Sequence, residues 1–191
     1  MINVAMAFLV ETLANLFIVA LLLRFLMQWT RASFQHPFGQ FVIAITDFAV
    51  RPLRRMVPGI LGMDWVSIII AYLVKLVAVS VLLFLEGFPF MVATGNVWGG
   101  LLLLALARLL ELLLYVVIGL VFVQALVSWI NPFSPVAPVL HALTRPVLAP
   151  LRRVIPPVAN VDLSPLAAFV VCELLILLPV AGLDRLARGM M

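Results

Sequence analysis

Charged residues are scarce in this chain. They make up 10% of its 191 residues, whereas 66% are hydrophobic. Soluble globular proteins usually have about 25% charged and about 45–50% apolar residues, and a disordered chain needs low hydrophobicity with high charge. The composition therefore excludes both of these classes and indicates an integral membrane protein.

Cysteine and histidine are almost absent. Cys172 is the only cysteine, so the chain can form no internal disulfide and no cysteine-based metal cluster. His36 and His141 are too few for a histidine-rich metal site. The sequence also has no P-loop, no G-x-G-x-x-G and no H-E-x-x-H motif. We therefore expect no enzymatic activity, no cofactor and no metal.

Long apolar runs are what the sequence does have. A transmembrane helix needs about 20 mostly apolar residues, and four stretches qualify, at about 12–29, 65–85, 112–129 and 165–183. The third has an apolar lead-in at 101–107, and Pro179 is expected to kink the last one. All four tryptophans fall near a proposed helix end, where aromatic belts lie. We predict an all-α integral membrane protein with four transmembrane helices.

The links between these helices are unequal. Residues 30–64 and 131–163 form long links that hold ten of the thirteen prolines and seven of the twelve basic residues. The positive-inside rule places both long links in the cytoplasm and both termini outside. Glu11 interrupts the first apolar run, which therefore reads as a retained span and not as a cleaved signal.

The two halves of the chain repeat each other at a shift of 100, then 98, residues. Glu11 matches Glu111, Trp29 matches Trp129 and Thr46 matches Thr144, and P-L-R-R-x-[VI]-P followed by an aspartate occurs at 52–64 and again at 150–162. Prolines and charges do not align by hydrophobicity alone, so the match indicates a duplication. We predict two parallel repeats, 1–95 and 96–191, each built as helix, basic loop, helix.

Two hydrophobic hairpins with this Pro/Arg loop resemble the two-repeat form of the YggT family, also called YlmG, over about residues 11–183. The resemblance implies a bacterial inner-membrane protein without established enzymatic activity. It also implies links to cell division and nucleoid distribution, to osmotic tolerance, or to the assembly of membrane complexes, without choosing among them.

The paired arginines of the two loops are the first candidate site: Arg54, Arg55, Arg152 and Arg153. Residues 38–50 and 136–145 are apolar enough to lie flat in the membrane interface, and Pro52 and Pro150 are expected to break the helix just before each pair. The arginines could contact anionic lipid or a partner, or they could only fix the topology. They are too few for direct nucleic-acid binding.

Asp64 and Asp162 precede the second helix of each repeat. A carboxylate there can cap the helix by accepting from its free N–H groups. A second reading pairs each aspartate with the arginine pair of its own repeat, and the two readings are compatible.

Lys75 and Glu173 lie near the centres of their helices at equivalent repeat positions. Lone charges at that depth cost about 2.5–3.5 kcal/mol on insertion scales. We therefore predict an intramembrane ion pair between them. The alternatives are that one group is neutral, that local water solvates it, or that both belong to a proton or ion pathway.

Three weaker polar signals lie inside the spans. Arg24 is close enough to Trp29 to snorkel to the loop-side headgroups. Asn15 can hydrogen-bond across helices, and Arg108 is expected to pair with Glu111, three residues on.

These features favour a non-enzymatic membrane scaffold or assembly factor whose cytoplasmic loops contact anionic lipid and partners, in cell division or envelope organisation. The expected partners are membrane lipids and unidentified membrane or cytoplasmic proteins, with a homo-oligomer also open and no direct nucleic acid. The alternative is a small channel or transporter involved in osmotic response, which Lys75, Glu173, Glu11 and Glu111 would support.

Overall fold

The computed structural model describes residues 2–54, 64–90, 96–155 and 162–191, and this part of the chain is helical with no strand. Within these ranges, four helical stretches are long and apolar enough to cross a membrane: α1 (Ile2–Trp29), α3 (Trp65–Leu85), α4 (Val97–Ile130) and the run Ser164–Met190. The last comprises α6 (Ser164–Leu175), the π-helical turn η2 (Ile176–Val180) and α7 (Ala181–Met190). The expected all-α fold with four spans is confirmed.

Three spans are longer than the sequence predicted. α1 begins at Ile2 and not near residue 12, α4 joins the expected third span to its apolar lead-in, and the last span continues to Met190. Glutamate is a good helix former, so Glu11 and Glu111 lie inside helices and do not end them. At about 1.5 Å per residue, α4 is about 51 Å long. It must therefore tilt or project beyond a hydrocarbon core of about 30 Å.

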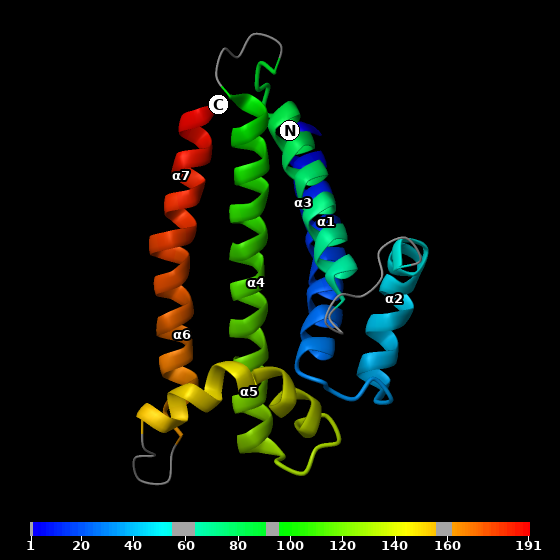
Figure 1. Ribbon diagram of the computed structural model, residues 1–191, viewed down its shortest axis with the longest axis vertical. Coiled ribbons are helices and arrows are strands. Elements are labelled where there is room, and N and C mark those ends of the chain that lie inside the picture. Colours follow the sequence, from blue (N-terminus) through cyan, green and yellow to red (C-terminus); the bar gives the residue numbers. More distant parts are fainter. Residues whose placement is uncertain (1, 55–63, 91–95, 156–161) are drawn as a thin grey trace.

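The spans stand side by side with α4 in the middle (Figure 1). α1 packs against α3 on one side of α4, and α6 and α7 pack against α4 on the other. Both chain termini lie at one end of the bundle, which we call the terminal end. α2 (Pro37–Arg54) and α5 (Ala137–Val154) lie at the opposite end, which we call the loop end.

Both long links contain an amphipathic helix, α2 or α5, of 18 residues each. The expected helix breaks are wrong, because α2 continues through Pro52 and α5 through both Pro146 and Pro150. A proline removes one backbone hydrogen bond. Pro52 and Pro150 lie close to the helix ends, where few later turns depend on that bond.

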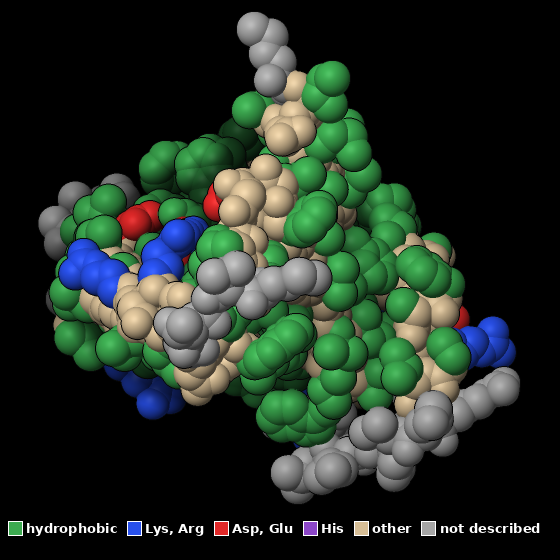
Figure 2. All heavy atoms as spheres, turned by 90° about the horizontal axis from the view of Figure 1, so that it is seen from above, with side chains coloured by type: hydrophobic (Ala, Val, Ile, Leu, Met, Phe, Trp, Pro, Cys, Tyr) green, Lys and Arg blue, Asp and Glu red, His purple; other side chains and the backbone are tan. Residues whose placement is uncertain are grey.

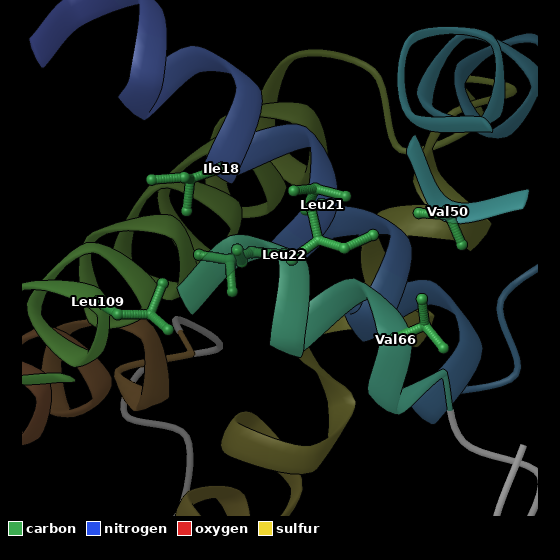
Figure 3. Packing of buried hydrophobic residues seen from close by; sticks show 8 residues of the cluster. Ile18, Leu21, Leu22, Val50, Val66 and Leu109 are labelled. Atoms are coloured by element: carbon green, nitrogen blue, oxygen red, sulfur yellow. The ribbon is translucent and has the colours of Figure 1, made fainter. Parts of the chain in front are cut away.

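A buried cluster joins the first hairpin to the centre of the bundle (Figure 3). Ile18 and Leu22 of α1 meet Val66 of α3, Val50 of α2 and Leu109 of α4. Lipid tails are as apolar as these side chains, so close packing, and not exclusion from water, favours such contacts within a membrane.

Close backbone approach marks the contact between α4 and α7. A Cβ atom added at Gly100 would lie 2.8 Å from the backbone oxygen of Ala187 and 2.6 Å from Cγ of Met191. Small residues allow this kind of packing between membrane helices. The distortion expected at Pro179 takes the form of η2, since π-helical turns accommodate a missing hydrogen bond within an α-helix.

Candidate functional site

Arg24 is the centre of a polar cluster at the loop end of the first repeat. Its guanidinium donates a hydrogen bond to Oγ1 of Thr46 at 2.9 Å and lies 3.3 Å from Oδ1 of Asp47, both on α2. Its Nε lies 3.3 Å from Oδ2 of Asp64, the residue before α3. Arg24 is 6% exposed. The snorkelling prediction is therefore wrong, because the side chain finds its acceptors within the protein.

In the second repeat, different residues connect the amphipathic helix α5 to its neighbours. At the shift of 100 residues, Gln124 takes the place of Arg24, and its side-chain oxygen accepts a hydrogen bond from Thr144 of α5. Asp162, the counterpart of Asp64, pairs with Arg152 of α5 at 2.9 Å. Each repeat thus ties its loop helix to its first span through a threonine. Among the described residues at the loop end, an arginine connects the two spans of the first repeat but not those of the second.

The two aspartates differ as helix caps. Asp64 occupies the N-cap position of α3 without a side-chain capping hydrogen bond, and its carboxylate accepts from the Ser67 hydroxyl at 3.0 Å. Asp162 accepts from the backbone N–H of Ser164 at 2.9 Å and also pairs with Arg152. Leu163 holds the N-cap position of α6, but Asp162 accepts from the first helical N–H and also pairs with Arg152. Asp64 holds the N-cap position of α3 and pairs with Arg24.

Two opposing effects set the acidity of Asp162. Partial burial raises the pKa of its carboxyl, but the hydrogen bonds from Ser164 and Arg152, with the positive charge of Arg152, outweigh burial and leave the pKa below its ordinary value. The carboxylate is thus held ionised beside Arg152.

The paired arginines are described in full only in the second repeat. Arg152 and Arg153 lie in the last turn of α5 and are exposed. α2 ends at Arg54, whose side chain, like all of Arg55, lies outside the described residues. Four further residues make the loop end a basic surface with apolar insertions: the exposed arginines Arg51 and Arg145, and the exposed rings of Phe41 and Phe48 on α2.

The predicted pair between Lys75 and Glu173 does not form. Lys75 is 7% exposed, and its ammonium donates to Oδ1 of Asn15 on α1 at 2.8 Å. This is the hydrogen bond across helices expected of Asn15. Glu173 is exposed on α6. α3 packs on α1 and α4, whereas α6 packs on α4 and α5. Equivalent depth therefore does not bring the two charges together.

A charged cluster lies at the terminal end between α4 and α7. Arg108 pairs with Glu111 at 3.0 Å, as expected, and with Asp184 of α7 at 3.2 Å, and Asp184 also pairs with Arg188 at 2.9 Å. Figure 2 looks onto this end and shows basic and acidic side chains gathered at the left, the side on which Figure 1 draws α7. This group joins the fourth span to the third by charge as well as by packing.

A cleft of about 430 Å³ lies beside this cluster, between the two hairpins. Lys75 lines it together with Glu11 of α1, Arg108 of α4 and Arg188 of α7, among apolar side chains. The cleft reaches the middle of α3, where the Lys75 ammonium has three donors. Among the described residues, the hydrogen-bond acceptor found for it is Asn15. Water or a small anion in the cleft could accept from the other donors.

Comparison with known proteins agrees with the duplicated architecture. The CCB3/YggT family model matches the chain twice, over residues 3–85 and 103–183. The chain belongs to the CCB3/YggT family. It is therefore a multi-pass membrane protein of that family, with two repeats, as the Pro/Arg loops suggested.

Several YggT-family relatives cover nearly the whole chain. The protein YggT of Escherichia coli K12 is 33% identical over 162 residues, which cover 84% of this chain and 81% of the relative. Uncharacterised proteins of Pseudomonas aeruginosa and Vibrio alginolyticus are each 32% identical, over 95% and 87% of this chain and 91% and 88% of the relatives. No solved structure matches the chain.

The sequence reasoning missed the cluster around Arg24. One signal was available, since Thr46 and Thr144 match between the repeats, and a polar residue at the same place in both repeats is expected to have a structural partner there. The acceptors of Arg24 lie on α2 and just before α3, at least 22 residues away in sequence. Spacing within one helix could not have found them.

Proposed function

We propose that this protein is a non-enzymatic membrane scaffold or assembly factor that works through its loop end. The observation that carries the proposal is the placement of α2 and α5, two amphipathic helices fixed at the same end of one bundle. Thr46 and Thr144 hold these helices to the spans. The result is a rigid, basic surface at the membrane face.

Charge supports a contact with anionic lipid. Each basic residue close to an anionic membrane surface contributes about 1 kcal/mol. Five arginines among the described residues at the loop end are exposed: Arg31, Arg51, Arg145, Arg152 and Arg153. Phe41 and Phe48, 63% and 72% exposed, add apolar groups suited to the headgroup boundary. Lipid contact would hold α2 and α5 in the interface plane and leave the arginine-rich ends for a protein partner.

The basic loop end would face the cytoplasm of a bacterial inner membrane, by the positive-inside rule. A partner there would belong to cell division or to envelope organisation, as the family resemblance implies. Its contact would be with acidic side chains, because exposed guanidinium groups form two-pronged hydrogen bonds to carboxylates.

Co-purification tests the scaffold. Wild type and the Arg54/Arg55/Arg152/Arg153→Ala variant would be isolated in native lipid particles at matched expression, with Arg185→Ala at the terminal end as control. We expect the same defined set of proteins to co-purify with wild type and with the control. The fourfold variant should no longer capture these proteins. If both wild type and the variant come down alone, the scaffold proposal is wrong.

A second candidate, a small channel or transporter in osmotic response, is favoured by one observation, the polar cleft that ends at Lys75. Flux of ions and small solutes in proteoliposomes discriminates the two candidates. A channel should lose flux on Lys75→Met while partners stay attached, whereas a scaffold should show no flux above empty liposomes and should lose partners only when the loop arginines are removed.

A further inference from the structure

The two hairpins differ where their spans meet the loop end. In the first repeat, Phe25 of α1 and Trp65 of α3 contact each other with ring centroids 6.3 Å apart, beside the pair between Arg24 and Asp64. These two contacts fill the space between the spans and close the hairpin at this end.

Among the described residues of the second repeat, the corresponding positions make neither contact. Ala125 stands at the position of Phe25, and Leu163 at that of Trp65. Gln124 bonds to Thr144 and Asp162 to Arg152, so both polar side chains turn to α5 and do not bridge α4 and α6. The buried contact between these spans lies deeper in the bundle, at Val121 and Ala168.

A groove of about 300 Å³ lies where the aromatic pair is missing. Ala125 and Leu163 both line it. Three apolar side chains along it are exposed, with Phe122 at 51%, Leu126 at 36% and Leu166 at 63%, so the groove faces the hydrocarbon of the membrane. Its volume is at the lower end of the range of about 300–1,000 Å³ for ligand sites.

The loop-side end of this groove is polar. Four polar side chains line it: Arg152, its partner Asp162, Ser128 and Gln124. Trp129, 75% exposed, lies at the depth of a headgroup belt. The bond to Asp162 uses only Nε of Arg152. The two terminal amino groups of that guanidinium are donors suited to a phosphate, and Arg153 is exposed next to it. A basic mouth on an apolar groove matches an amphiphile with an anionic headgroup.

We propose that this groove binds one anionic phospholipid, with an acyl chain between α4 and α6 and its phosphate at Arg152 and Arg153. The inference deepens the lipid-contact part of the proposed function and rests on it. It differs from general attraction to the membrane surface, because it assigns one lipid to one repeat. The corresponding place in the first repeat is filled by Phe25 and Trp65.

The test is to give the second hairpin the residues of the first. Three proteins would be purified in detergent with phosphatidylglycerol or phosphatidylcholine. They are wild type, the Ala125→Phe/Leu163→Trp variant, and a control that introduces the same two residues on the exposed side of α3, Val77→Phe/Leu73→Trp. Native mass spectrometry counts the lipids retained. We expect wild type and control to retain one phosphatidylglycerol more than the filled variant.

Headgroup recognition is tested separately. Arg152→Gln/Arg153→Gln should reduce the preference for phosphatidylglycerol over phosphatidylcholine about tenfold while a lipid can still enter the groove. If the filled variant folds poorly, Ala125→Leu alone narrows the groove and should lower occupancy. An unchanged lipid count in the filled variant, or an unchanged preference without the arginines, overturns the inference.

Failure of the groove and failure of the scaffold are distinguishable. If the groove does not bind a lipid, the filled variant retains as many lipids as wild type, while partner capture still depends on the loop arginines. If the protein is not a scaffold, wild type captures no partner, although the number of retained lipids still falls in the filled variant.

Discussion

Arg24 and Asp64 form an ion pair in which both side chains are almost wholly buried, at 7% and 1% exposed. The pair joins the loop end of α1 to the N-cap residue of α3, and Thr46 and Asp47 of α2 contact the same guanidinium. One side chain thus fixes three elements of the first repeat.

Removal of Arg24 should destabilise the protein strongly. Arg24→Met leaves the Asp64 carboxylate buried without this cation, and breaking a buried pair typically costs about 3–5 kcal/mol. The matched change in the second repeat, Gln124→Met, removes one neutral hydrogen bond and should cost about 1 kcal/mol. Unfolding free energies measured in the same detergent would compare them. Equal losses for the two variants would contradict the role given to Arg24.

The bond between Lys75 and Asn15 should show coupling in a double-mutant cycle. Asn15→Leu leaves the ammonium without its acceptor and should destabilise, whereas Lys75→Met should be close to neutral, since it removes a charge from the membrane interior. The double variant should recover most of the loss caused by Asn15→Leu. Coupling of about 0.6–1.7 kcal/mol is expected for such bonds between membrane helices, and additive effects would contradict the bond.

A charge swap separates the observed partner of Lys75 from the one expected by repeat symmetry. Because Lys75 bonds to Asn15 and Glu173 is exposed on α6, Lys75→Glu/Glu173→Lys should not recover the stability lost by Lys75→Glu alone. Thermal unfolding of the two single variants and the double variant would show this. Full recovery of stability in the double variant would instead support the ion pair between Lys75 and Glu173.

Apolar runs and the internal repeat were enough to predict four spans and two hairpins. They could not predict the polar contacts, because contacts depend on which way each helix face points. Repeat symmetry places Lys75 and Glu173 at the same depth, but α4 stands between their helices. Arg24 similarly looks like a snorkelling residue when α1 is considered alone, and only the folding of α2 beside α1 supplies its acceptors.

The stability contributed by the ion pair between Arg152 and Asp162 should depend on pH only in acidic solution. The pKa of Asp162 is lowered in the folded protein, so its stabilising effect is fully present above the unfolded value of about 3.9 and is lost as the pH falls through the lower, folded value. The melting temperatures of wild type and Asp162→Asn should therefore differ by a constant amount from pH 5 to 8. They should converge below about pH 4. A difference that disappears near pH 6 would contradict this ionisation.

Sidedness can be measured with single cysteines. In a Cys172→Ala background, Ser33→Cys lies at the loop end and Gly189→Cys at the terminal end, and both positions are exposed. If the loop end is cytoplasmic, a membrane-impermeant thiol reagent added to cells with a permeabilised outer membrane should label Gly189→Cys but not Ser33→Cys. Labelling of Ser33→Cys alone would reverse the orientation.

The most direct test of the scaffold function removes the arginine pair of each repeat separately and then both pairs together. Quantitative co-purification would compare wild type with Arg54/Arg55→Ala, Arg152/Arg153→Ala, the fourfold variant and Arg185→Ala. We expect each pair of substitutions to reduce the captured partners, the fourfold variant to capture none, and Arg185→Ala to match wild type. Equal capture by wild type and the fourfold variant would contradict a function at the loop end.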